Sequence, residues 1–202
     1  MSKFLFAIIM LCLPELVIAQ SQPILVLGDS ISAGYGLEVS QGWVSILEKK
    51  LIETNRHYSI INASISGETS AGGLSRLNAL LSTHKPSIIL VQLGANDGLR
   101  GLSPVQMKNN LSEIVHLSQQ SGAKVILLAM KIPPNYGKRY VEQFYAVYPQ
   151  LAQALTVQLV PFILEDVALN KDLMQADGLH PNAKAQSILA DKIEPYLFPL
   201  LK

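Results

Sequence analysis

Five short apolar runs alternate along the 202-residue chain with longer segments of helical periodicity, and this alternation restricts the fold more than any other feature. The apolar runs are rich in Val, Ile and Leu and nearly continuous in hydrophobicity, which is typical of strands that are covered on both faces. Among the segments between them, Pro104 marks an expected helix start and Gly122 an expected helix end. The order predicts an α/β fold in which a five-stranded parallel sheet lies between two helix layers, a three-layer α/β/α sandwich.

The boundaries of the expected elements follow from where each pattern starts and stops. The strands are predicted at residues 24–27, 59–62, 87–93, 124–130 and 158–161. The helices are predicted near residues 43–54, 71–81, 104–121, 140–155 and 183–196.

The first 19 residues differ from the rest of the chain. Lys3 is followed by an uncharged apolar run over residues 4–13, and the segment ends on the small residue Ala19. A short positive start, an apolar middle and a small-residue exit predict a secretory signal peptide. The alternative is a membrane anchor, which is disfavoured because Pro14 and Glu15 interrupt the run and a span needs about 20 apolar residues.

Residues 20–202 are then expected to form a single domain of ordinary size. The net charge of +1 gives no electrostatic reason to expect binding to nucleic acid or to an anionic membrane. The only cysteine, Cys12, would leave with the signal peptide, so the mature protein has neither a disulfide nor a thiol nucleophile. We expect a monomer in the periplasm or secreted from the cell, without nucleic-acid partners and without stable insertion into a membrane.

Polar clusters follow the predicted strands at their carboxyl ends. Ligands of parallel sheets bind at this edge, so the clusters are candidates for one shared site. They lie at residues 28–30 after the first strand, 62 and 66–69 after the second, 94–98 after the third, 131–136 after the fourth and 177–181 after the fifth, before the last helix.

Ser30 is the candidate nucleophile of this edge. A serine hydroxyl is a weak nucleophile unless a base removes its proton, and histidine is the usual base, with a carboxylate that orients its ring. Of the four histidines only His180 lies at this edge, and Asp177 precedes it by three residues, so one tight turn can bring carboxylate and imidazole together. Either motif alone could be an ordinary turn, but both on the same edge favour a serine hydrolase.

Attack on an ester creates an oxyanion, which needs hydrogen-bond donors that are already in place. The backbone N–H of Ser30 is one candidate, and that of Gly67 is a second because no side chain obstructs it. The side-chain amide of Asn96 is a third candidate, although an asparagine close to Gly98 could equally be a turn residue.

Four blocks of the sequence together resemble the SGNH subclass of the GDSL hydrolases, within it most closely the bacterial periplasmic thioesterases, arylesterases and lysophospholipases. The blocks are Gly-Asp-Ser-Ile at 28–31, Asn62 to Gly67, Gly-Ala-Asn-Asp at 94–97 and Asp-Gly-Leu-His-Pro at 177–181, and residues 97–101 and 133–137 strengthen the match. The resemblance extends over about residues 23–196. Ile31 replaces the leucine of the family name and Ala95 a frequent glycine, and neither residue carries a catalytic group.

The resemblance implies a flavodoxin-like sheet and an enzyme that hydrolyses esters, thioesters and lysophospholipids without a metal or cofactor. It implies that Ser30 is the nucleophile, that His180 is general base and then acid, and that Asp177 orients the imidazole. Asp29 would hold the serine turn in place. The oxyanion hole would consist of three donors: the backbone N–H groups of Ser30 and Gly67 and the side-chain amide of Asn96.

The resemblance also implies an apolar groove for the acyl chain, beside a mobile loop at residues 99–104. Its expected lining consists of Leu99, Met130, Ile132, Tyr136 and Leu179, although Met130 and Ile132 could equally be core residues at the end of a strand. Such a groove discriminates each methylene by only ~1 kcal/mol, so we expect broad acyl specificity.

Two other functions fit the same pattern. One is a carbohydrate or peptidoglycan acetylesterase of the same fold, which is disfavoured because the residues that flank the four blocks are mainly aliphatic. The other is a periplasmic binding module without catalysis, against which the intact set of Ser30, Asp177 and His180 argues.

Overall fold

The structure, a computed structural model, describes residues 22–54 and 58–201, so the signal peptide predicted over residues 1–19 lies outside the described residues. Its centre is a parallel five-stranded sheet in the order β2-β1-β3-β4-β5. This is the flavodoxin-like order, and the predicted fold class is confirmed. The strands are β1 (Gln22–Gly28), β2 (Tyr58–Asn62), β3 (Ile88–Gln92), β4 (Lys124–Leu128) and β5 (Gln158–Val160), each close to its predicted position.

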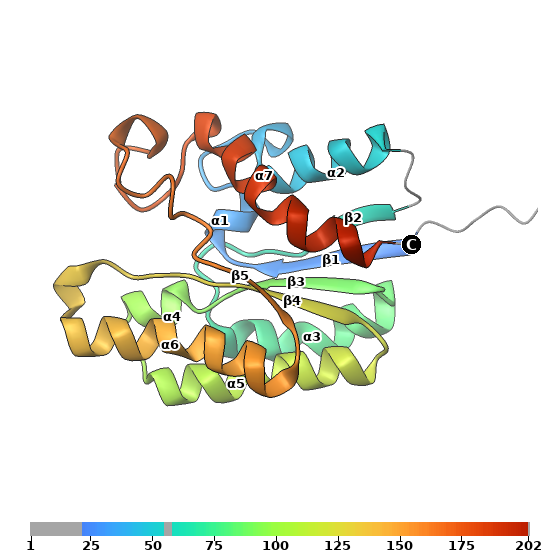
Figure 1. Ribbon diagram of the computed structural model, residues 1–202, viewed down its shortest axis with the longest axis horizontal. Helices are drawn as coiled ribbons and strands as arrows, with labels where there is room; N and C mark the ends of the chain where they lie inside the picture. Colours follow the sequence, from blue (N-terminus) through green and yellow to red (C-terminus); the bar gives the residue numbers. More distant parts are fainter. Residues whose placement is uncertain (1–21, 55–57, 202) are drawn as a thin grey trace, which may run out of the picture.

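Helices cover both faces of the sheet, as Figure 1 shows. On one face α2 (Trp43–Glu53) packs against α7 (Gln186–Leu197). The other face is covered by α3 (Ser70–His84), α5 (Pro104–Gln120) and α6 (Lys138–Leu155), which pack side by side in that order.

The core follows directly from the apolar runs of the sequence. In β1 and β3, the central strands, both faces are buried, and residues such as Leu25 and Leu90 are fully inaccessible to solvent. The helices contribute one apolar face each, with Trp43 from α2 and Phe144 from α6 among the largest buried side chains. Burial on both faces explains why the strands show continuous hydrophobicity instead of alternation.

Two short helices at the carboxyl edge of the sheet were not predicted. Helix α1 (Ser30–Ala33) starts directly after β1, and α4 (Ala95–Leu99) starts after β3. Both are too short to show helical periodicity. From β1 the chain adds β2 on one side of the sheet and then β3, β4 and β5 on the other side. The strand order therefore reverses between β1 and β3, and folds of this type bind ligands at the carboxyl ends of the two strands that flank such a switch point.

The remaining helical turns are of the 3₁₀ type, and one of them modifies a prediction. The helix predicted over residues 183–196 begins instead as the separate turn η4 and continues as α7. The turns are η1 (Val39–Gln41), η2 (Pro134–Tyr136), η3 (Lys171–Leu173), η4 (Ala183–Ala185) and η5 (Phe198–Leu200). In the described part of the chain, no helix combines the length and hydrophobicity needed to cross a membrane.

Candidate active site

Ser30 is the first residue of α1, at the end of a central strand. Asp29 caps this helix, since its Oδ1 accepts a hydrogen bond of 3.0 Å from the backbone N–H of Ile31. Capping satisfies an N–H group that has no partner within the helix. The cap therefore fixes the first turn, and with it the backbone of Ser30.

The structure brings together the serine, histidine and aspartate that the sequence singles out. Oγ of Ser30 lies 2.9 Å from Nε2 of His180, and Nδ1 of His180 lies 2.6 Å from Oδ2 of Asp177. The other oxygen of Asp177, Oδ1, accepts hydrogen bonds from the backbone N–H groups of Leu179 at 2.9 Å and His180 at 3.0 Å. The tight turn expected between Asp177 and His180 is therefore present.

The charge of Asp177 determines the tautomer of His180. Partial burial raises the pKa of Asp177, but hydrogen bonds from the backbone and ring of His180 and from the backbone of Leu179 outweigh it and lower this pKa to about 2. An ionised carboxylate can only accept hydrogen bonds, so Nδ1 of a neutral His180 must be the donor. Nε2 then carries a lone pair that can accept the proton of Ser30.

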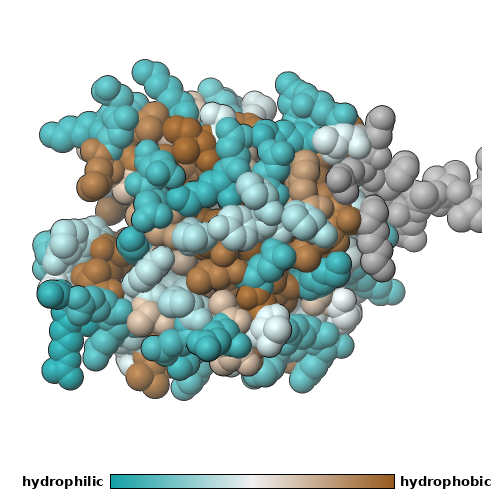
Figure 2. Space-filling model, in the orientation of Figure 1, coloured by the Kyte–Doolittle hydropathy of each residue, from teal (hydrophilic) through white to brown (hydrophobic). Residues whose placement is uncertain are grey.

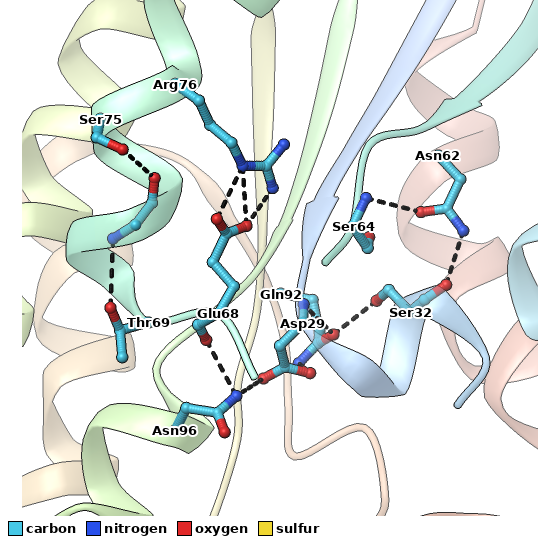
Figure 3. Close-up of polar contacts among 11 residues, drawn as sticks. Asp29, Ser32, Asn62, Ser64, Glu68, Thr69, Ser75, Arg76, Gln92 and Asn96 are labelled. Atoms are coloured by element: carbon cyan, nitrogen blue, oxygen red, sulfur yellow. Dashed lines mark hydrogen bonds and ion pairs between the residues drawn. The ribbon is translucent and has the colours of Figure 1, made fainter. Parts of the chain in front are cut away.

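Asn96 lies in α4, between the loop that contains Gly67 and the residue before Ser30. Its Nδ2 donates to the backbone carbonyl of Glu68 at 3.0 Å and approaches Oδ2 of Asp29 at 3.4 Å, as Figure 3 shows. Gly67 has a φ of +80°, which disfavours any residue with a side chain. The residues of the three expected oxyanion donors thus belong to segments that Asn96 connects.

A buried glutamine at the end of β3 holds Asp29, and the site predicted from the sequence does not include it. Nε2 of Gln92 donates to Oδ1 of Asp29 at 3.0 Å, and Oε1 of Gln92 accepts from Oγ of Ser32 at 2.6 Å. Gln92 is fully buried and Asp29 is 1% exposed. A polar residue that ends an otherwise apolar strand was the one local signal that could have identified Gln92 (Figure 3).

Burial also changes the acidity of Asp29. Removal from water raises its pKa from the ordinary value of 3.8 to about 6, although the hydrogen bonds from Ile31 and Gln92 favour the ionised form. Desolvation is the larger effect because a buried carboxylate loses its hydration. Asp29 is therefore a buried acid that titrates near pH 6 and contacts both the serine turn and Asn96.

The loop before α3 is fixed by charged and polar side chains. Glu68, whose carbonyl accepts from Asn96, forms an ion pair with Arg76 of α3. Asp97 of α4 accepts hydrogen bonds from the backbone N–H of Ser70 at 2.8 Å and from its hydroxyl at 2.5 Å. Arg100 donates to the carbonyl of Gly67 at 2.7 Å. Together these contacts connect the start of α3 to α4.

The five residues expected to line an acyl groove divide into three groups. Ile132 and Leu179 share a depression of about 460 Å³ between the segment after β4 and the segment after β5. Tyr136 and Leu99 are not among the residues that line this depression. They contact each other, since the tyrosine hydroxyl donates to the Leu99 carbonyl at 2.8 Å. Met130 is 2% exposed and belongs to the core, the alternative that the sequence had left open.

The depression is mainly apolar. Figure 2 shows hydrophobic surface on both sides of a hollow at the end of the molecule where the strands finish. Besides Ile132 and Leu179, its apolar lining includes Pro133, Pro134, Phe162, Leu164, Ala168, Leu169 and Met174. Among residues 22–54 and 58–201, no group of three or more His, Cys, Asp or Glu side chains is placed to hold a metal ion.

The model of the GDSL-like lipase/acylhydrolase family matches residues 26–188. The chain belongs to this family. The matched residues of this GDSL hydrolase include Ser30, Asp177 and His180, and membership makes the chain an enzyme that hydrolyses acyl compounds.

Several relatives match most of this GDSL hydrolase. It is 50% identical over 183 residues to Esterase TesA of Pseudomonas aeruginosa, with 91% of each chain covered. It is 47% identical to Arylesterase of Vibrio mimicus, covering 85% of this chain and 86% of the relative. It is 45% identical to Thioesterase 1/protease 1/lysophospholipase L1 of Escherichia coli, covering 91% of this chain and 86% of the relative.

Solved structures agree with this assignment. The crystal structure of TesA superposes on this GDSL hydrolase with a TM-score of 0.87 at 50% identity, and covers 89% of this chain and 100% of that one. The psychrotrophic esterase EstA from Pseudoalteromonas sp., in a structure inhibited by monoethylphosphonate, gives a TM-score of 0.85 at 44% identity, and covers 88% of this chain and 97% of that one.

Proposed function

We propose that this enzyme hydrolyses carboxylic esters and thioesters, among them aryl esters, acyl-CoA thioesters and lysophospholipids, through an acyl-enzyme on Ser30. The observation that carries the proposal is the 2.9 Å contact between Oγ of Ser30 and Nε2 of His180, with Asp177 on the other side of the ring. The names of the relatives support the range of substrates, since they include an arylesterase and a thioesterase/lysophospholipase.

The reaction proceeds in two acyl transfers. Oγ of Ser30 attacks the carbonyl carbon of the substrate while Nε2 of His180 takes the serine proton. The tetrahedral intermediate collapses, His180 returns the proton to the leaving alcohol or thiol, and the acyl group remains bonded to Ser30. Water then attacks this ester with His180 again as base, and the carboxylic acid leaves as Ser30 recovers its proton. Asp177 keeps the imidazole oriented throughout.

Asn96 and the backbone N–H groups of Ser30 and Gly67 stabilise the oxyanion of each intermediate. In the resting enzyme one N–H of the Asn96 amide is used by the carbonyl of Glu68 at 3.0 Å. The contact with Asp29 is long, at 3.4 Å, and therefore weak. The amide can exchange this weak bond for a strong one to the oxyanion, so its stabilising effect is largest in the transition state.

The apolar depression that contains Ile132 and Leu179 receives the acyl chain. Most of its lining residues are aliphatic, with Phe162 as the one aromatic and Lys131 and Glu165 as the charged residues, which favours acyl substrates over acetylated carbohydrates. Because such a surface discriminates each methylene by only ~1 kcal/mol, chains of several lengths are accepted.

The cellular setting belongs to the same proposal. The N-terminal pattern of Lys3, an apolar run and Ala19 supports export by a signal peptide to the periplasm or beyond, where the mature domain acts as a monomer on small acyl substrates.

The test is an assay of residues 20–202 on p-nitrophenyl esters of rising chain length and on acyl-CoA thioesters, with a chelator present. We expect hydrolysis by the wild type and near-complete loss in Ser30→Ala and His180→Ala. Exposed Ser82→Ala, in α3, is the matched control. Equal activity of wild type and Ser30→Ala would show that another group is the nucleophile.

A further inference from the structure

The side chain of Gln175 connects two loops, the turn that follows the helix of Ser30 and the segment that contains His180. Its Nε2 donates to the backbone carbonyl of Tyr35 at 2.7 Å and to that of Pro181 at 3.1 Å. Tyr35 lies in the turn that follows α1, the helix that begins with Ser30, and Pro181 directly follows His180. The two N–H groups of one amide therefore bridge the two segments, and Gln175 itself is 140 residues from Tyr35 in the chain.

The main chain of Gln175 holds the histidine segment as well. Its N–H donates to the carbonyl of His180 at 2.8 Å, and its carbonyl accepts from the N–H of Gly178 at 3.0 Å. Met174 and Pro181 form an antiparallel bridge beside it. Gln175 thus closes the turn that contains Asp177 and His180, so a displacement of Gln175 moves the imidazole and its carboxylate together.

Tyr35 adds a second contact between the two loops. Its ring lies against the imidazole of His180, with 4.6 Å between the ring centroids and 38° between the planes. The tyrosine covers one face of the imidazole and limits its rotation. Since Gln175 binds the backbone of Tyr35, the position of the Tyr35 ring against the imidazole also depends on Gln175.

The turn after α1 is shaped to accommodate Gln175. A Cβ atom at Gly36 would lie 2.5 Å from Oε1 of Gln175, closer than real contacts allow, whereas a Cβ at Gly34 would meet nothing within 4 Å. Both glycines have a positive φ, +76° and +74°. Substitution by alanine therefore strains the backbone equally at both positions but displaces Gln175 only from Gly36.

We propose that Gln175 is a positioning residue that sets the distance between Oγ of Ser30 and Nε2 of His180. The inference rests on the proposed function, in which these two atoms exchange a proton. Gln175 touches neither the substrate nor the reacting atoms. It acts by fixing the position of the turn after α1 relative to the turn that contains His180. A misplacement of about 1 Å between two reacting groups can lower the rate about a hundredfold.

The first test is Gln175→Met, which keeps the length of the side chain but removes its donors. We expect kcat on a short p-nitrophenyl ester to fall about ten- to a hundredfold with little change in KM, because alignment is lost and substrate binding is not. Phosphonate labelling of Ser30 should slow in parallel. Gln119→Met is the matched control, since Nε2 of Gln119 also donates to a backbone carbonyl, that of Leu155, but far from the site.

The second test separates displacement of Gln175 from loss of stability. Gly36→Ala and Gly34→Ala should lower the melting temperature by similar amounts, whereas kcat should fall much further in Gly36→Ala. Combined with Gln175→Ala, which leaves room for the new methyl group, Gly36→Ala should cause little additional loss of kcat. The comparison of these glycine variants tests whether Gln175 is a positioning residue even if Gln175→Met does not fold.

The outcomes distinguish the inference from the proposed function. Full activity of Ser30→Ala would overturn the proposed function, and the inference with it. An inactive Ser30→Ala together with a Gln175→Met whose kcat is within about twofold of the wild type would overturn the inference alone. Equal kcat values for Gly36→Ala and Gly34→Ala would also overturn it.

Discussion

Nε2 of His180 lies 2.9 Å from Oγ of Ser30, although 150 residues separate them in the chain. The sheet order makes this contact possible, because Ser30 begins the helix after a central strand and His180 lies in the segment that returns from β5, the edge strand, toward α7. The contact between Ser30 and His180 therefore depends on how the segment after β1 packs against the segment after β5, and the residues around it provide separate tests.

Asn96→Ala tests the oxyanion hole. We expect kcat to fall by about 10²–10³-fold, the usual effect of removing one oxyanion donor, with a smaller change in KM. Steady-state kinetics on one activated ester measure both constants. The control is Asn109→Ala, because Asn109 is an exposed residue of α5. A kcat equal to that of the wild type would remove Asn96 from the oxyanion hole.

Gln92→Leu tests the buried network under the serine turn. The substitution leaves the Ser32 hydroxyl without its acceptor and removes one of the donors to Asp29, so the free energy of unfolding should fall by about 1–3 kcal/mol. Urea unfolding measures this loss. Gln106→Leu on the exposed side of α5 should change it by less than about 0.5 kcal/mol. Equal stabilities of the two variants would contradict the role of Gln92.

Asp29 should make stability depend on pH. Its pKa is about 6 in the folded protein against 3.8 ordinarily, so between these values the folded state binds more protons than the unfolded state. The contribution of Asp29 to the free energy of unfolding therefore falls as pH rises from about 4 to about 6, by about 3 kcal/mol in all. Above pH 6 it stays at this lower value.

Comparison with Asp29→Asn isolates this effect, because asparagine does not titrate. The free energy of unfolding of the wild type minus that of the variant should be larger at about pH 4 than at about pH 7, by about 2 kcal/mol. Urea unfolding of both proteins at the two pH values measures it. An unchanged difference would mean that Asp29 keeps its ordinary pKa.

Leu179→Ala tests the acyl groove. Leu179 is 43% exposed and contributes to the apolar depression, so its truncation removes contacts that only longer chains reach. The ratio of kcat/KM for an octanoyl ester to that for an acetyl ester should fall by about tenfold, the equivalent of one or two methylene contacts. Ile52→Ala, at an exposed site on α2, should leave this ratio unchanged. A ratio unchanged in Leu179→Ala would place the acyl chain elsewhere.

The sheet and the long helices could be predicted from the sequence because each has a pattern of its own. A strand buried on both faces is a continuous apolar run, and a helix on its surface repeats every three to four residues. Helices α1 and α4 have no such pattern, since one turn is too short to repeat. Their formation depends on Asp29 as the cap of α1 and on Gly94, with its φ of +112°, before α4.

The candidate site likewise contains residues that could be predicted from the sequence and residues that could not. Ser30, Asp177 and His180 could be identified because their types, their spacing and their strand ends pointed to one reaction. Gln175 could not, since it has no local signature, and Gln92 has only its place at the end of an apolar strand; their partners are 140 and 63 residues away. The burial of Met130 likewise depends on packing between distant elements.

The central claim is that Ser30 carries the acyl group, and mass spectrometry after phosphonate treatment tests it most directly. A p-nitrophenyl alkylphosphonate should add one phosphonyl group to the wild-type protein, on the peptide that contains Ser30. Ser30→Ala should stay unmodified, and His180→Ala should react far more slowly. A phosphonyl group found on another residue, or equal labelling of wild type and Ser30→Ala, would contradict the mechanism.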